Sequence, residues 1–272
     1  MSQLKILSLG AGVQSSTLFL MACFDEIERF DHAIFADTGW EPEPVYRWLK
    51  YLKKQGKKHG IPIHTVSQGN IRNDILISQV RGTKKDGRRW ASMPLFVLAP
   101  DGKKGMIRRQ CTYEYKIRPI ERKQRDLAGY KPRKRMPPGT IECWKGISTD
   151  EAKRAIVSDR KWISFYYPLI EMRMRRSDCL AWFLKRGLPE PPRSACVGCP
   201  FRHNSEWMDL KNNSIKDFKD AILVDKAIRK IGGMRGDVFL HADRIPLDEV
   251  VFNKNGNQPS LFSDECAGIC GV

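Results

Sequence analysis

The sequence predicts an α/β protein in which a parallel sheet carries helices on both faces and a cysteine-containing region extends the C-terminal part. Hydrophobic periodicity over the first 66 residues gives the order β-α-β-α-β, which is typical of parallel sheets. A glycine-containing loop joins the first strand to the first helix. Hydrophobic residues make up 41% of the 272 positions, enough to form a sizeable core.

The first loop has the composition of a phosphate-binding turn. From Lys5 to Thr17 a hydrophobic strand passes into two glycines, a polar Gln-Ser-Ser-Thr stretch and then a hydrophobic helix. Glycine lets the backbone approach an anion closely, and the free N–H groups of a helix N-terminus favour negative charge. The predicted nucleotide-binding residues here are Ser8, Gly10, Gly12, Gln14, Ser15 and Ser16.

This segment has two other interpretations. A glycine-rich turn without a ligand remains open, because the Lys that completes a Walker A loop is absent. A lipoprotein signal peptide ending in LMAC is disfavoured, since a signal h-region does not usually contain Gly-x-Gly followed by Gln-Ser-Ser-Thr.

The next elements are a helix from Thr17 to Ile27 and a short strand from Ala33 to Ala36. This strand delivers Asp37, Thr38 and Gly39 to its carboxyl end. In an open parallel sheet the ligand crevice lies at the carboxyl ends of the strands, so these three residues join the predicted nucleotide site. Asp37 is also a candidate catalytic residue, and the alternative is that it caps a turn.

The β-α-β-α-β order is completed by a helix from Val45 to His59, with Pro44 near its start, and by a third strand from Ile61 to Val66. We expect residues 1–180 to form the nucleotide-binding α/β domain, with a basic insertion at about 81–140. We expect residues 181–272 to form a C-terminal helical, cysteine-containing region and tail.

Positive charge is concentrated in the middle of the chain. The net charge is +17, and the segment from Arg81 to Arg135 holds eighteen Lys and Arg against five Asp and Glu. Trp90, Tyr113, Tyr115 and Tyr130 are interleaved among these cations. Counterion release and base stacking would favour a nucleic-acid partner, tRNA or DNA. The alternatives are a basic surface that keeps the protein soluble, or cations that hold a nucleotide substrate.

The eight cysteines do not have the spacing of a small disulfide-linked domain. Cys196-Val-Gly-Cys199 presents two sulfurs on one tight turn, which suits zinc or an iron–sulfur cluster; a thiol redox pair ranks third. Cys23, Cys143 and Cys179 lie in hydrophobic contexts typical of buried cysteines. The many thiols predict a reducing, cytoplasmic location, and the lack of an apolar run of 18 residues predicts no membrane span.

The loop resembles the PP-loop of ATP pyrophosphatases, in the S-x-G-x-G-x-Q-S form found in relatives of phosphoadenosine-phosphosulfate (PAPS) reductase, with Gln14 where the common motif has Asp. DTG followed by Trp and Glu resembles a second signature of that family, and KGISTDEAKR, YYPLIE and CPFRHNSEW extend the likeness. The resemblance implies an adenine nucleotide alpha hydrolase-like fold of the PP-loop type. It also implies ATP with Mg²⁺ as cofactor, or adenylylsulfate or PAPS as substrate.

In iron–sulfur members of the family a Cys-Cys pair and a later CxxC ligate a [4Fe–4S] cluster. This chain has Gln110-Cys111 at the first position, so the resemblance implies Cys111, Cys196 and Cys199 as ligands, with zinc less favoured. The tail DECAGICGV resembles the segment that carries the nucleophile of sulfonucleotide reductases. Cys266 is therefore a candidate catalytic nucleophile, and either Cys266 or Cys270 is a candidate fourth ligand.

Two enzyme mechanisms are compatible with these features. In the first, ATP adenylates a nucleic acid and sulfur from a donor protein then displaces AMP, as in tRNA or DNA thiolation. In the second, Cys266 attacks adenylylsulfate or PAPS and a thioredoxin-like reductant releases sulfite. The charge pattern favours the first and the tail favours the second. A third interpretation is a non-catalytic nucleic-acid-binding protein with structural zinc.

Overall fold

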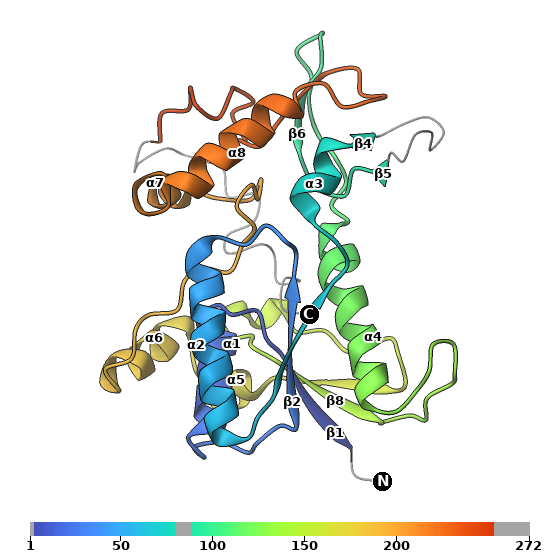
Figure 1. The fold of residues 1–272 in the computed structure, drawn as a ribbon, viewed down its shortest axis with the longest axis vertical. Helices are drawn as coiled ribbons and strands as arrows, with labels where there is room; N and C mark the ends of the chain where they lie inside the picture. Colours follow the sequence, from blue (N-terminus) through green and yellow to red (C-terminus); the bar gives the residue numbers. More distant parts are fainter. Residues whose placement is uncertain (1–2, 80–88, 253–272) are drawn as a thin grey trace.

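A five-stranded parallel sheet forms the centre of the protein. The computed structural model describes residues 3–79 and 89–252. The strands are β1 (Leu4–Ser8), β2 (His32–Asp37), β3 (Ile63–Ser67), β8 (Ile141–Lys145) and β9 (Ile163–Tyr166). They lie in the order β3-β2-β1-β8-β9 and every neighbouring pair is parallel. The predicted parallel α/β fold is confirmed (Figure 1).

Helices cover both faces of this sheet. α1 (Val13–Cys23) and α2 (Glu43–His59) pack on one face, and α4 (Arg118–Leu127) contacts β2 and β3 on the other. The predicted helices and strands are present with shifted ends: α1 begins four residues before Thr17. Its polar first turn is helical because all its side chains are buried against other parts of the protein.

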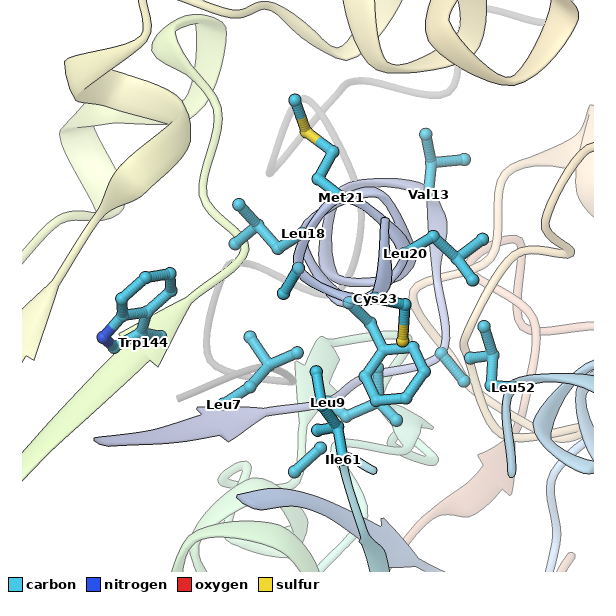
Figure 2. Packing of buried hydrophobic residues seen from close by; sticks show 14 of the residues in the cluster. Leu7, Leu9, Val13, Leu18, Leu20, Met21, Cys23, Leu52, Ile61 and Trp144 are labelled. Carbon is cyan, nitrogen blue, oxygen red and sulfur yellow. The ribbon is translucent and has the colours of Figure 1, made fainter. Parts of the chain in front are cut away.

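The main core lies between α1 and the sheet. Figure 2 shows Leu7 of β1 beneath the buried side chains of α1, with Trp144 of β8 beside them. Neighbouring residues of a strand point to opposite faces, so Ile6 packs with Ile34 and Ile141 in a second cluster on the α4 side. Each of these strands is therefore buried on both faces, which places β1 in the middle of the sheet.

A second layer of structure lies over the carboxyl edge of the sheet (Figure 1). It contains a three-stranded antiparallel sheet and several helices with their own core. Its elements are α3 (Ile71–Leu76), β4 (Ser78–Gln79), β5 (Arg89–Trp90), β6 (Phe96–Leu98), β7 (Lys104–Met106), α7 (Asn204–Asn213), α8 (Ile215–Ala227) and β10 (Asp237–Phe239). The shorter connecting elements are the π-helical turn η1 (Tyr113–Ile117), the 3₁₀ turn η2 (Thr149–Arg154), α5 (Pro168–Glu171) and α6 (Arg176–Lys185).

The buried carboxylate of Asp225 holds this second layer together. It accepts hydrogen bonds from the backbone N–H groups of Leu240, at 2.8 Å, and Leu247, at 3.1 Å. It also pairs with Arg229, which lies just beyond the end of α8. One side chain thereby fixes two loop segments against α8.

The basic segment is divided between two edges of the sheet. Lys131, Arg133, Lys134 and Arg135 are exposed in the loop between α4 and β8. The end of this loop bonds to the start of β1, because Leu4 N donates to Thr140 O at 3.0 Å. It therefore lies at the amino edge of the sheet. The predicted phosphate-binding loop from Gly10 to Ser16, which we call the phosphate loop, lies at the opposite edge. Among the described residues no helix is both long and apolar enough to cross a membrane.

Candidate nucleotide and thiol site

The phosphate loop leaves β1 at the point where the chain switches from one half of the sheet to the other. Gly12 precedes α1 in an extended conformation, and no side chain caps the helix. Ser15 Oγ accepts a hydrogen bond from Gly10 N at 3.1 Å. A Cβ at Gly146, just after β8, would lie 2.7 Å from Ser15 N. Only glycine fits there, and the helix N-terminus is bordered by backbone, as an anion site requires.

The hydroxyl groups of this loop have different environments. Ser16 Oγ accepts a hydrogen bond from the indole of Trp48 at 2.8 Å. Ser8 is buried at the end of β1, and its Oγ has no hydrogen-bond partner among the described residues. Burying a hydroxyl without a partner is costly. Ser8 is therefore the predicted binding residue whose side chain most clearly requires a ligand or water.

The side chain of Gln14 is bonded on both sides of its amide. Nε2 donates to Glu151 Oε2 at 3.1 Å and to Ser148 Oγ at 3.4 Å, and Oε1 accepts from Arg176 Nη1 at 3.2 Å. These partners come from η2 and α6, about 130 to 160 positions later in the chain. The sequence alone did not identify them. Gln14 links the first turn of α1 to those elements, and its predicted role in nucleotide binding stays a prediction.

Asp37 lies at the carboxyl end of β2, next to the phosphate loop. Its Oδ1 accepts hydrogen bonds from Gly39 N at 2.8 Å and from Tyr46 Oη at 2.9 Å. Burial and the bond to Asp37 raise the pKa of Tyr46 above its usual range. Gly39 has φ +74°, and a Cβ there would lie 2.8 Å from the Asn70 amide. The turn that Asp37 was considered to cap is present, and its predicted catalytic and nucleotide-binding roles stay predictions.

Three of the predicted ligand cysteines line one small cavity. Cys111 precedes η1, whereas Cys196 and Cys199 lie on a turn closed by the Cys199 N to Cys196 O bond at 3.1 Å. Thr38, from the DTG turn, also lines the cavity, and its Oγ1 lies 3.3 Å from Cys196 Sγ. The structure therefore brings Cys111 to the same cavity as Cys196, which lies 85 positions later in the sequence. Cys266 and Cys270 lie outside the described residues.

The buried ammonium group of Lys116 lies among the cysteines of this cavity and near the carboxylate of Glu41. Burial raises the pKa of the Cys196 and Cys111 thiols. Burial favours the neutral form of Lys116, but Glu41 and the cysteines outweigh that effect and raise its pKa. Lys116 Nζ lies 3.8 Å from Glu41 Oε1. The other oxygen, Glu41 Oε2, is buried with no hydrogen-bond partner in the part of the chain described.

The turn from Cys196 to Cys199, which we call the thiol turn, is held by Arg202 and Trp40, two residues for which the sequence predicted no such role. Arg202 is buried and donates to the carbonyl groups of Ala195, Cys196 and Val197 at 3.0–3.1 Å. Trp40 follows the DTG turn, and its carbonyl accepts from Val197 N at 2.8 Å.

The Trp40 ring adds a steric constraint on the same turn. A Cβ at Gly198 would lie 2.1 Å from the Trp40 ring, and Trp40 Nε1 donates to Asp220 on α8 at 2.7 Å. The only signal in the sequence was the aromatic residue directly after DTG.

Cys111, Cys196 and Cys199 are candidate metal ligands by their chemistry, because thiolates bind both zinc and iron–sulfur clusters. They line one cavity together with Lys116 and Arg109. Within residues 3–79 and 89–252, no three His, Cys, Asp or Glu side chains converge so that they could hold one metal ion. The predicted [4Fe–4S] cluster therefore stays a prediction.

Comparisons with known proteins find similarity in structure but not in sequence. No family model and no curated protein matches the sequence. The structure is similar to the phosphoadenylyl-sulfate (PAPS) reductase from Candida auris in its phosphate complex, with 14% identity and a TM-score of 0.41. The match covers 70% of this chain and 76% of that chain. The fold and the site described above rest on this chain's own strand order and contacts.

Proposed function

We propose that this chain is a PP-loop enzyme that binds ATP at the loop from Gly10 to Ser16 and transfers sulfur to a nucleic-acid acceptor at the adjacent thiol cavity. The position of Thr38 is the observation that carries the proposal. Its backbone belongs to the turn after β2, next to the phosphate loop, and its hydroxyl lies 3.3 Å from Cys196 Sγ. An enzyme that activates an acceptor with a nucleotide and then adds sulfur needs these two centres side by side.

The proposed reaction conserves atoms and electrons. A carbonyl oxygen of the acceptor attacks the α-phosphorus of Mg²⁺-bound ATP, a P–O bond forms, and pyrophosphate leaves. Hydrosulfide supplied by a donor then attacks the activated carbon. The C–O bond breaks, AMP leaves with the acceptor oxygen, and the proton of hydrosulfide passes to solvent. The uncapped N-terminus of α1 would stabilise the charge that develops on the phosphates.

The cysteines of the cavity supply the sulfur-handling part of the proposal. Cys111, Cys196 and Cys199 would hold a [4Fe–4S] cluster, which supplies an iron without a protein ligand where sulfur can bind. Lys116 and Arg109, which line the same cavity, would offset the negative charge of the thiolates. Apolar side chains complete the lining and limit the entry of water; they are Ile71, Met93, Pro94 and Phe201.

The test is a reaction with ATP labelled in the α-phosphate, sulfide, and either tRNA or DNA, carried out anaerobically. We expect pyrophosphate to form only when the acceptor is present, AMP to form only when acceptor and sulfide are both present, and sulfur to replace oxygen in the recovered nucleic acid. Gly12→Val should abolish the reaction, whereas Gly105→Ala, whose Cβ would lie 3.8 Å from Val97, serves as the matched glycine control. Full activity of Gly12→Val would contradict the proposed nucleotide site.

A sulfonucleotide reductase is the second candidate, and Glu265-Cys266 in the tail is the observation that favours it. In that reaction the Cys266 thiolate attacks the sulfur of adenylylsulfate or PAPS, an S–S bond forms and the adenosine phosphate leaves. A dithiol reductant then becomes a disulfide and releases sulfite. Sulfite formation without a nucleic acid, lost in Cys266→Ser, would replace the first proposal by this one. A colourless, zinc-loaded protein that binds nucleic acid but no nucleotide would support the non-catalytic alternative.

A further inference from the structure

Two exposed aromatic side chains lie beside the segment that lines the cysteine cavity. Trp90 is 41% exposed and Tyr113 is 53% exposed. Ser92 O accepts hydrogen bonds from Gln110 N at 2.8 Å and from Cys111 N at 2.9 Å. These bonds tie the segment that contains Trp90 to the start of the segment that contains Tyr113.

The two segments run antiparallel, which places Trp90 and Tyr113 at the same end of their hydrogen-bonded pairing. Ile107 N donates to Leu95 O at 2.8 Å, so the two segments run antiparallel from that bond to the bonds at Ser92. Trp90 lies two residues beyond Ser92, and Tyr113 lies two residues beyond Cys111, both in the direction away from Leu95. The backbone positions of Trp90 and Tyr113 therefore lie at the same end of the paired segments, next to Cys111, which lines the cavity.

Exposed cations accompany the two rings. Arg108 and Arg118 are exposed on either side of the cavity-lining residues, and Lys103 and Lys104 are exposed on the neighbouring β7 hairpin. Asp101, in that hairpin, is paired with Lys103 at 2.8 Å. This part of the surface has an excess of positive charge, which is complementary to a phosphate backbone.

We propose that the acceptor binds as an unpaired single strand across the surface formed by Trp90, Tyr113, Arg108 and Arg118, which we call the aromatic-basic face. Aromatic rings stack on bases that are not paired, while the arginines follow the backbone. The inference rests on the proposed function for its chemistry: a base whose carbonyl oxygen is to be replaced must leave a duplex to reach a buried cavity.

The other part of the basic segment does not belong to this face. Arg133, Lys134 and Arg135 are exposed in the loop that ends at the amino edge of the sheet, whereas Thr38 follows the carboxyl end of β2 and lines the same cavity as Cys111. The loop therefore supplies matched control positions, with similar charge and exposure but on the opposite side of the molecule.

Binding of fluorescent oligonucleotides to the anaerobically purified full-length chain tests the proposal. The probes are a single-stranded oligonucleotide and a duplex of the same length, as DNA and as RNA. Trp90→Leu and Tyr113→Leu should each weaken single-strand binding about tenfold or more. Arg108→Gln with Arg118→Gln should reduce the slope of log affinity against log salt by about 1.4, from two phosphate contacts.

The matched control for the charges is Arg133→Gln with Lys134→Gln, and the control for loss of a ring elsewhere is Tyr130→Leu, at a partly buried tyrosine beside the loop. The controls should leave single-strand affinity within about twofold, and the thermal unfolding of each variant should match that of the wild type. Unchanged single-strand binding in the two aromatic variants, or equal loss in the loop controls, would overturn the proposal. So would tighter binding of the duplex, or binding of neither probe, which would leave the face to a protein partner.

The same titrations separate this inference from the proposed function. Oligonucleotide binding by Gly12→Val should equal that of the wild type if the aromatic-basic face is correct, whether or not ATP binds. Loss of aromatic-dependent binding with sulfur transfer intact would reject the face alone. Aromatic-dependent binding without any consumption of ATP would reject the proposed reaction alone.

Discussion

Gly198→Ala is the sharpest test of how the thiol turn is held. A Cβ at this position would lie 2.1 Å from Cη2 and 2.5 Å from Cζ3 of Trp40. Ordinary carbon contacts are about 3.5–4.0 Å, so the ring or the turn must move by about 1.5 Å. Trp40 is only 4% exposed, and its Nε1 donates to Asp220, which also pairs with Arg72 at 2.6 Å. The ring is therefore fixed on both sides.

The magnitude follows from these contacts. Overpacking of a buried position costs about 1–3 kcal/mol, and losing a hydrogen bond to a charged acceptor costs about 1.5–3 kcal/mol. Because only one of the two elements has to move, we expect Gly198→Ala to lower the free energy of unfolding by about 2–4 kcal/mol. We also expect it to lower iron retention, since displacement of the turn moves Cys196 and Cys199 away from Cys111.

Urea unfolding and iron analysis after anaerobic purification measure both effects. Gly105→Ala should stay within about 0.5 kcal/mol of the wild type, because its Cβ meets only Val97 at 3.8 Å. Trp40→Phe removes the outer ring atoms, so the double variant Trp40→Phe with Gly198→Ala should be more stable than the sum of the single losses by about 1 kcal/mol or more. Additive losses, or a Gly198→Ala variant as stable as Gly105→Ala, would refute the steric argument.

Three further outcomes are expected. Gly12→Val should lower ATP affinity at least about tenfold, or 1.4 kcal/mol, because a side chain would hinder the close approach of a phosphate; calorimetric titration measures it. The variant should still fold, because Gly12 has φ −93° and its Cβ would meet Ser194 at an ordinary 3.5 Å. Cys111→Ser, Cys196→Ser and Cys199→Ser should each lower iron content, and full retention by all three would reject a shared centre. Burial lowers the pKa of Lys145 from its usual 10.5. Between that lowered pKa and pH 10.5 the unfolded chain holds a proton that the folded chain has released, so the free energy of unfolding rises with pH. Lys145→Met should lose this rise when urea unfolding is followed against pH.

The sequence was sufficient to predict the parallel sheet and the position of the phosphate loop. Both are local features: a strand, a glycine-containing turn and a helix lie within Lys5 to Cys23 and need no distant partner. The predicted helix began at Thr17, so Gln14, Ser15 and Ser16 were assigned to the loop as side-chain donors, whereas in the structure they form the first turn of α1. Its partners, such as Trp48 on Ser16, come from other elements and become visible only in the folded chain.

The thiol site shows the same limit. The CxxC turn is a local pattern, but Lys116, Glu41 and Trp40 belong to it only because the second layer folds back over the carboxyl edge. The basic segment is continuous in the sequence, but in the structure its cations are divided between the β7 hairpin and the loop at Lys131–Arg135, on two sides of the sheet. Charge density along a chain does not determine charge density in space.

The amide of Gln14 has a consequence for how this loop can vary. It donates to Glu151 and accepts from Arg176, so a glutamate carboxylate at position 14 would face Glu151 across about 3 Å. Gln14→Glu alone should therefore be unfavourable, and Glu151→Gln in the same chain should restore the pairing. Among natural relatives we expect positions 14 and 151 to covary, with an acidic residue at one excluding an acidic residue at the other. The residue that this loop can carry at position 14 therefore depends on a residue 137 positions later in the chain.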